Sequence, residues 1–247
     1  MKILLLDIET SPNSAYVWGL WDQNVGLSQL IDSSETLCWS AKWYGSDEVL
    51  FQGINRTSRT RMVRAIHSLI NRADIIVHYN GSRFDLPTLN KEFLLYGLPP
   101  PAPVKQIDLL RVVKKQFRFP SNKLDYVAQA LKLGSKQPTT FKLWVNCMNG
   151  DAEAWEVMEE YNKQDVLLLE RLYERLKPWI KHPINRSLDP ANDGLVCPAC
   201  GSDKYQKRGF YFTASCKYQR YCCKDCSAWF RDTKSIAPRS GEKFVQL

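Results

Sequence analysis

The sequence lacks a long apolar run. The N-terminal hydrophobic stretch from Ile3 meets Asp7 and Glu9 at once, and no run approaches the ~18–20 apolar residues that a membrane span requires. The stretch is also too short for a secretory signal peptide. Internal repeats and low-complexity tracts are absent as well. We therefore expect a soluble, cytoplasmic protein with no membrane partner, and the sequence leaves a bacterial or viral origin open.

Histidine and acidic residues are also scarce. The three histidines have no partners at metal-binding or catalytic spacing, so we assign them no role. Asp and Glu number 26 against 34 Lys and Arg, which gives a formal net charge of +8. The surplus is concentrated in residues 186–247 and in residues 105–142, where nine basic side chains oppose Asp108 and Asp125 alone. Two basic regions suggest a polyanionic partner, although an ordinary solvated surface would give the same count.

The apolar residues that are present suffice for a folded core. Hydrophobic residues make up 44% of the chain, and their spacing predicts an α/β domain whose first three strands form an antiparallel meander. We expect strands at 2–8, 36–44, 48–54, 74–79 and around 107, helices at 60–73, 86–96, 122–133 and 151–180, and a loop at 134–149. The last helix should bury a stripe of leucines: Leu167, Leu168, Leu172 and Leu176.

Composition divides the chain into four segments. Residues 1–183 form the α/β domain, and the Pro-, Asn- and Asp-rich residues 184–194 read as a linker. A cysteine-bearing module at 195–235 and a polar tail at 236–247 follow.

Three short motifs place carboxylates at the ends of the predicted elements. Asp7 and Glu9 lie two apart on the first strand, so they point to the same face, although most Asp-x-Glu pairs are simply exposed surface. Asp85 follows an Asn-Gly turn and opens a helix, where it could act as a cap. Tyr161 and Asp165 share one face of the last helix, as a boundary pair on an amphipathic helix also would.

Taken together, the four acids are more informative than any one motif. Asp7, Glu9, Asp85 and Asp165 stand on separate elements and offer hard oxygen ligands, the kind that suits Mg²⁺ or Mn²⁺. Two such ions can activate water and stabilise the leaving oxygen in phosphodiester hydrolysis. Tyr161, one turn from Asp165, would orient or deprotonate the attacking water.

In this order, Asp-Ile-Glu-Thr, Asn-Gly-x-x-Phe-Asp-Leu-Pro and Tyr-x-x-x-Asp resemble the three motifs of the DnaQ-like (DEDD) 3′–5′ exonucleases. Tyr161, with Glu160 instead of a histidine before it, is similar to the DEDDy subgroup. The Asp-Leu-Pro continuation resembles the exonuclease domains of family B DNA polymerases. The resemblance covers about residues 1–180 and implies an RNase H-like fold, a five-stranded mixed sheet flanked by helices.

The resemblance also implies roles for the acids. Asp7 would bridge two Mg²⁺ or Mn²⁺ ions, with Glu9 and Asp165 on the nucleophile-side ion. Asp85 would serve the second ion through water, and Asn80 would contact the substrate's terminal region.

Four further features belong to this comparison. Phe84 is expected to pack in the core, and Asp108 matches an accessory acid whose role could equally be structural. Lys123 and Lys136 lie in a basic region that resembles the segment flanking the strand-binding cleft, so we expect them to bind substrate. No polymerase domain follows within these residues, so we expect no proofreading in cis.

Six of the eight cysteines fall within thirty residues. Cys197 with Cys200 and Cys223 with Cys226 form two Cys-x₂-Cys pairs with 22 residues between them, a spacing that suits one tetrahedral structural Zn²⁺. Cys222 could take the place of Cys223 as a zinc ligand only with a looser Cys-x₃-Cys spacing to Cys226. The surrounding residues resemble the zinc ribbons of transposases and transcription-type proteins, which selects Cys223 and leaves Cys222 out.

Basic and aromatic residues alternate through this ribbon. Lys207, Arg208 and Arg220 interleave with tyrosine, phenylalanine and tryptophan, a pattern that favours nucleic-acid binding. A purely structural mini-domain or a protein-docking module is the alternative.

The sequence therefore predicts a metal-dependent 3′–5′ exonuclease that acts on nucleic acid, with single-stranded DNA 3′ ends as the expected substrate. The ribbon would hold the substrate, and replication or recombination proteins are possible partners. A structure-selective endonuclease on branched DNA is the first alternative. A catalytically silent nucleic-acid-binding accessory protein is the second.

Overall fold

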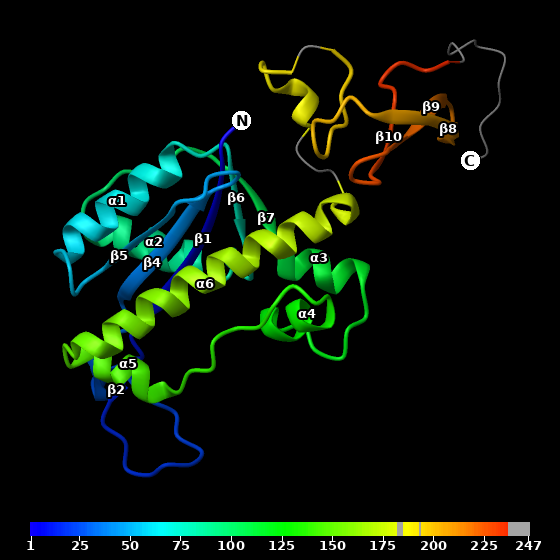
Figure 1. Ribbon diagram of the computed structural model, residues 1–247. Coiled ribbons are helices and arrows are strands. Elements are labelled where there is room, and N and C mark those ends of the chain that lie inside the picture. Colours follow the sequence, from blue (N-terminus) through cyan, green and yellow to red (C-terminus); the bar gives the residue numbers. More distant parts are fainter. Residues whose placement is uncertain (182–184, 193, 237–247) are drawn as a thin grey trace. The chain divides into compact units, whose positions relative to one another are not determined.

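The computed structural model describes residues 1–181, 185–192 and 194–236, and the chain divides into two compact units (Figure 1). One unit runs from Lys2 to Tyr173, and the other from Glu174 to the C-terminus together with Met1. The predicted linker, 184–194, lies partly outside the described residues, and the predicted polar tail, 236–247, lies almost wholly outside them.

A five-stranded mixed sheet forms the centre of the Lys2–Tyr173 unit. Its order is β5–β4–β1–β6–β7. The strands are β1 (Ile3–Thr10), β4 (Thr36–Trp43), β5 (Val49–Gly53), β6 (Ile75–His78) and β7 (Lys105–Asp108). β1 is antiparallel to β4 and parallel to β6, which confirms the predicted mixed sheet and its antiparallel meander. Because β1 is the middle strand, its apolar run is buried from both faces.

Helices cover both faces of this sheet (Figure 1). Leu4, Leu6 and Ile8 of β1 pack in one core with α1 (Arg59–Asn71) and α2 (Asp85–Leu95). The long helix α6 (Ala152–Leu176) packs against the other face, where a second core contains Cys38 of β4. Since side chains alternate along a strand, Asp7 and Glu9 point to the α6 side.

α6 has 25 residues and a charged outer face. Among the residues that the structure describes, no helix combines the length and apolarity needed to cross a bilayer. Leu168, Leu172 and Leu176 are buried as predicted. Leu167 is only half-buried and Leu169 is buried instead, so the predicted stripe is wrong by one residue at that turn.

Three helices between β7 and α6 differ from the sequence prediction. α3 (Leu109–Gln116) was not predicted, and α4 (Leu124–Ala130) is shorter than the predicted helix over 122–133. α5 (Phe141–Met148) occupies half of the predicted loop over 134–149. α3 and α5 have eight residues each, too few for propensity alone to stabilise a helix, so tertiary packing decides their structure.

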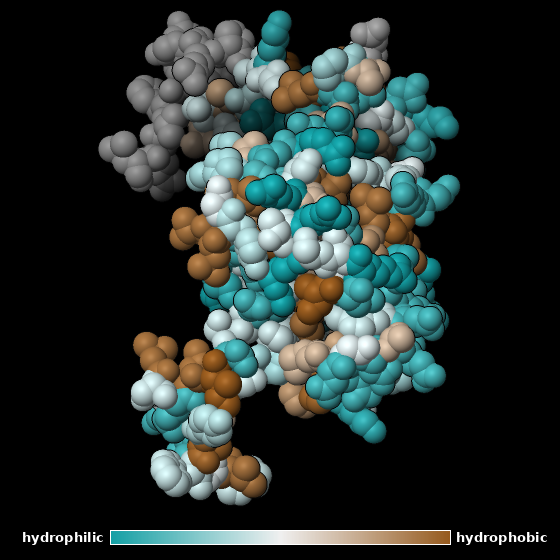
Figure 2. All heavy atoms as spheres, turned by 90° about the vertical axis from the view of Figure 1, so that its left-hand side faces the viewer, coloured by the Kyte–Doolittle hydropathy of each residue, from teal (hydrophilic) through white to brown (hydrophobic). Residues whose placement is uncertain are grey.

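A projecting loop joins β2 (Ser14–Ala15) to β3 (Leu30–Asp32), and the sequence did not predict either strand. Figure 2 shows hydrophobic side chains gathered on a projection at the bottom of the molecule, where Figure 1 places this loop. Trp18 is fully exposed, and Leu20, Trp21 and Leu27 are more than four-fifths exposed. No Lys or Arg occurs from Ile3 to Ala41, so this apolar surface carries no positive charge.

The second unit contains a small antiparallel sheet. Its order is β10–β9–β8, formed by β8 (Tyr205–Phe212), β9 (Lys217–Cys223) and β10 (Trp229–Arg231). Its small core consists of Cys197, Ala199, Cys223 and Ala228. So few buried side chains cannot fold a module of this size unaided, which makes a metal cross-link the expected source of stability.

Candidate active site and metal centre

The first part of the candidate site lies at the end of β1. Asp7 pairs with Ser40 of β4 and Glu9 with Cys38, and the register shifts immediately after Glu9. Both carboxylates are half-buried and face α6. The strand thus presents two acids, side by side, at the edge of the core.

α6 brings the third carboxylate to the same place. Carboxylate oxygens of Asp7, Glu9 and Asp165 all lie within 4.8 Å of one another. Tyr161 stands one turn before Asp165 on the same helix face and is buried. Oxygen Oδ1 of Asp165 is buried and has no hydrogen-bond partner among the described residues. A buried carboxylate oxygen without a hydrogen-bond partner, beside two further carboxylates, has the environment of a cation ligand.

Asp85 reaches the site from the start of α2. Its Oδ1 accepts a hydrogen bond from the backbone N–H of Ile8, 3.2 Å away, so it is tied to the strand between Asp7 and Glu9. It lies outside the group of three acids whose oxygens share the 4.8 Å limit. The predicted alternative of a helix cap finds no support, because Phe84 is the N-cap residue and α2 has no side-chain cap bond.

The turn before Asp85 depends on one glycine. Asn80 has a left-handed φ of 69°, and a Cβ on Gly81 would lie 2.6 Å from the ring of His78. The backbone N–H of Gly81 instead donates to Nδ1 of His78 at 3.0 Å. Phe84 is 45% exposed, so the expectation that it packs in the core is wrong. The turn directs Phe84 outward and Asp85 inward.

Asp108 holds the same turn from β7. Its carboxylate accepts hydrogen bonds from the Asn80 backbone N–H at 2.9 Å and from the Ser82 hydroxyl at 2.8 Å. It also caps α3 through the Leu110 N–H at 3.0 Å. The sequence left open whether Asp108 has a functional or a structural role, and these contacts are those of a structural role.

The charges of the acids are poorly compensated. Burial, followed by the charges of Asp85, Glu9 and Asp165, raises the pKa of Asp7 well above its ordinary value. Burial and the charge of Asp165 raise the pKa of Glu9 to about 7, and burial raises that of Asp85 to about 7. Each shift reflects a carboxylate that is costly to ionise without a cation nearby. The residues therefore fit a divalent metal with oxygen ligands.

Lys136 places a positively charged side chain beside the carboxylate cluster. Its Nζ lies 2.5 Å from Oδ2 of Asp165 and 3.4 Å from the Tyr161 hydroxyl. Its backbone N–H donates to Asp125 at 2.8 Å, which anchors the segment between α4 and α5. Burial lowers the pKa of Lys136, but the charges of Asp165 and Asp7 outweigh burial, so the net shift is upward and the ammonium group stays charged.

Two residues that sequence reasoning missed orient the acids. Nδ2 of Asn162 donates to Oδ2 of Asp7 at 2.7 Å, and the indole N–H of Trp144 donates to Glu9 at 3.2 Å. Asn162 lies three residues before Asp165, so helical spacing could have identified it. Trp144 stands on α5, in the segment predicted to be a loop, and only the fold places it.

The remaining predicted substrate residues lie elsewhere. Lys123 is exposed at the N-cap of α4. Lys207 and Arg208 of β8 and Arg220 of β9 belong to the C-terminal unit. Nε of Arg220 donates to the Arg208 carbonyl at 2.9 Å, so that two of the three are linked to each other.

The four predicted zinc cysteines converge in that unit. Sulfur atoms of Cys197, Cys200, Cys223 and Cys226 all lie within 4.8 Å of one another, with two of the pairs at 3.7 Å. Sulfurs of a tetrahedral zinc site with Zn–S bonds of about 2.3 Å stand about 3.8 Å apart. None of the eight cysteines is in a disulfide. The arrangement therefore fits one zinc ion.

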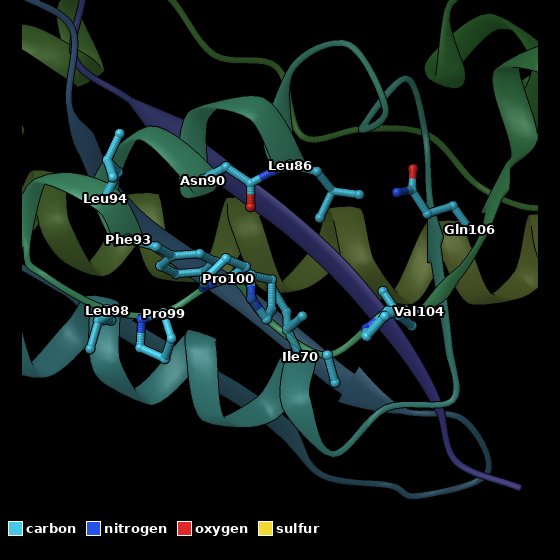
Figure 3. Close-up of a pocket in the computed structure, with 13 residues that line it drawn as sticks. Ile70, Leu86, Asn90, Phe93, Leu94, Leu98, Pro99, Pro100, Val104 and Gln106 are labelled. Carbon is cyan, nitrogen blue, oxygen red and sulfur yellow. The ribbon is translucent and has the colours of Figure 1, made fainter.

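A cavity of about 560 Å³ lies apart from these acids (Figure 3). Ile70, Leu86, Phe93 and Leu98 line it together with the proline segment that begins at Pro99, and Asn90 and Gln106 are its polar groups. None of the residues that line this cavity has an ionisable side chain, so the lining offers no group for acid–base or metal chemistry. The carboxylate cluster, on the α6 side of the sheet, is the better candidate for a catalytic site.

Comparisons with known proteins agree with this geometry. The sequence model of the RNase H superfamily matches residues 4–177. The structure of the family B DNA polymerase from the hyperthermophilic archaeon Pyrobaculum calidifontis is similar, with a TM-score of 0.55 and 18% sequence identity. The match covers 72% of this chain and 24% of the polymerase, so the chain spans about a quarter of that protein's length. At this identity the likeness concerns the fold. No curated protein matches the chain in sequence.

Proposed function

Because this chain belongs to the RNase H superfamily, we propose that it is a metal-dependent 3′–5′ exonuclease of the DEDDy type that acts on single-stranded DNA ends. Nuclease chemistry in general follows from the superfamily. The direction of attack and the substrate are the parts that we propose. One observation carries the proposal: oxygens of Asp7, Glu9 and Asp165 meet within 4.8 Å, with Asp85 tied to the same strand.

In this proposal, some side chains of the site bind metal and others orient the metal ligands. Asp7, Glu9, Asp85 and Asp165 would hold two Mg²⁺ or Mn²⁺ ions, which supply an activated water and stabilise the leaving oxygen. Asn162 fixes the orientation of Asp7, and Trp144 fixes that of Glu9, through the bonds described above.

Tyr161 and Lys136 would act on the substrate side of the acids. The Tyr161 hydroxyl lies near Lys136 and Asp165, so Tyr161 can orient a water that approaches the scissile phosphate. The Lys136 ammonium group can contact a phosphate oxygen, and Asn80 would contact the terminal nucleotide. Lys123 would bind the strand farther from the cut.

The C-terminal unit would assist by binding substrate. We propose that Cys197, Cys200, Cys223 and Cys226 hold one structural Zn²⁺ and that the ribbon carrying Lys207, Arg208 and Arg220 binds the nucleic acid. A basic module joined to a nuclease unit would raise the local concentration of strand ends. Replication or recombination proteins would then be natural partners.

A labelled-strand assay tests the proposal. The full chain is incubated with single strands labelled at the 5′ or the 3′ end, with duplexes and with branched DNA, with and without Mn²⁺, beside Asp7→Asn. We expect the 5′-labelled strand to give a ladder that shortens from the 3′ end only with Mn²⁺ and only with the unsubstituted protein. A single internal cut in branched DNA would contradict the exonuclease and support the endonuclease, whereas no cleavage of any substrate would contradict both.

A further inference from the structure

The two faces of the ribbon sheet carry different side chains. Tyr211 pairs with Tyr218, and Arg220 pairs with Arg231 across the β9–β10 ladder. Trp229 lies two residues before Arg231 and therefore on the same face. We call the surface formed by these five residues, Tyr211, Tyr218, Arg220, Trp229 and Arg231, the Arg–aromatic face.

Within this face, each arginine guanidinium group packs against aromatic rings. The guanidinium carbon of Arg231 lies 3.9 Å from the ring centre of Tyr218 and 5.4 Å from that of Tyr211. The Arg220 guanidinium lies 4.9 Å from the ring centre of Trp229. These contacts place the guanidinium groups against the rings, which orders both before any ligand arrives.

The face remains open to a ligand. Trp229 is 56% exposed and Tyr211 46% exposed, and the Arg231 side chain is exposed as well. The three strands of the ribbon contain no Asp or Glu, so nothing on the sheet neutralises the arginines internally. A partner that satisfies this face must therefore offer both negative charge and flat apolar surface.

Unpaired nucleotides have that combination. Their phosphates are anionic, and their bases expose planar faces that stack on aromatic rings and guanidinium planes. In a duplex these base faces are hidden. The projecting loop that contains Trp18 provides a contrast, because its exposed aromatics have no basic neighbour between Ile3 and Ala41.

We propose that the Arg–aromatic face is a base-stacking site for single-stranded nucleic acid. Trp229 and Tyr211 stack unpaired bases, and Arg220 and Arg231 contact the phosphates between them. This inference rests on the proposed function, because it names the surface with which the ribbon holds the strand.

The opposite face of the same sheet supplies a matched control. Phe212 is 66% exposed there and pairs with Lys217, whose Nζ lies 5.7 Å from its ring centre. Phe212→Ala therefore removes an exposed aromatic ring with a basic neighbour from the same small module, but from the other side. Loss of ribbon folding would affect both faces equally, whereas loss of a stacking site would not.

Binding to base-containing and abasic strands separates stacking from charge. The full chain carrying Asp7→Asn is titrated, without divalent cations, into labelled oligothymidylate of about 16 nucleotides and into an abasic strand of the same length. We expect the parent protein to bind oligothymidylate at least tenfold more tightly. Trp229→Ala should weaken that binding about tenfold, leave abasic binding unchanged and be largely rescued by Trp229→Phe.

The arginine and control variants complete the test. Arg231→Gln should weaken binding to both strands and reduce the slope of log K against log salt by about one. Phe212→Ala should change neither strand, with one zinc per chain in every variant. Equal binding of the two strands by the parent protein, or an equal loss in Phe212→Ala and Trp229→Ala, would overturn the inference. Nuclease activity is measured in a separate assay. Normal cleavage together with unchanged binding in Trp229→Ala would refute the stacking site alone. Absent cleavage together with the binding results expected above would refute the exonuclease alone.

Discussion

Replacing Glu9 by glutamine should stabilise the metal-free protein and weaken its stabilisation by metal. A carboxyl whose pKa is raised on folding binds a proton more tightly in the native state than in the unfolded chain. The free energy of unfolding therefore falls as pH rises from the unfolded pKa to the folded one. Glu9 has an ordinary pKa of 4.5 that burial and Asp165 raise to about 7, so in the metal-free protein its ionisation opposes folding above neutral pH.

The size of the effect follows from that shift. Each tenfold change in proton affinity corresponds to about 1.4 kcal/mol, so a rise in pKa from 4.5 to about 7 means that an ionised Glu9 costs the fold about 3–4 kcal/mol at pH 8.5. Glutamine removes this cost and keeps an oxygen that can accept the Trp144 hydrogen bond. For a unit of this size the melting temperature should rise by roughly 7–14 °C. At pH 5, where Glu9 is already protonated in the fold, the rise should be small.

Thermal unfolding checks the prediction with and without Mn²⁺. We expect Mn²⁺ at 100 times its Kd to stabilise the unsubstituted protein by about 2.7 kcal/mol and the Glu9→Gln protein much less. Glu156→Gln, at an exposed position on α6, removes one carboxylate far from the cluster and should change neither measurement. A lower melting temperature for Glu9→Gln in the metal-free protein at pH 8.5 would refute the reasoning, as would equal stabilisation of both proteins by Mn²⁺.

Three further outcomes are expected. Lys136→Met leaves Asp165, which is 2% exposed, without its ion pair, so the metal-free protein should lose about 3 kcal/mol in denaturant unfolding, and Mn²⁺ should restore part of it. Gly81→Ala forces a Cβ within 2.6 Å of the His78 ring, which should cost about 1–3 kcal/mol and lower cleavage by displacing Asp85; unchanged melting would contradict the crowding argument. Cys223→Ser should lose the zinc found by metal analysis, whereas Cys216→Ser should keep one equivalent, and zinc retention in both would show that Cys223 is not a ligand.

The sheet and its acids could be read from the sequence because the signals are local. β1 is a continuous apolar run that ends in two acids, and the strand period alone places Asp7 and Glu9 on one face. The Asn-Gly pair marks the turn before Asp85, although the sequence could not decide between a cap and a site acid. The hydrogen bond from Ile8 to Asp85 is a contact between distant segments, and only the fold decides it.

What the sequence could not predict depends on packing between distant segments. α5 has only eight residues and no side-chain cap at its start, so the helix that carries Trp144 has no local signature. Lys136 is one of nine basic residues in the region 105–142, and its approach to Asp165 depends on the anchor at Asp125. Phe84 is apolar and lies beside a buried acid, yet the turn at Gly81 points it to solvent.

The bond between Asn162 and Asp7 joins residues that are 155 positions apart in the chain. All five strands of the sheet have been translated once β7 is complete, but α6, with Asp165 and Asn162, has not yet been made. Until α6 has been made, the growing chain therefore contains at most three of the four acids, because Asp165 is still missing. The carboxylate cluster can therefore form only after α6 has left the ribosome and docked on the sheet, so the metal site is completed by the last element of its unit to be made.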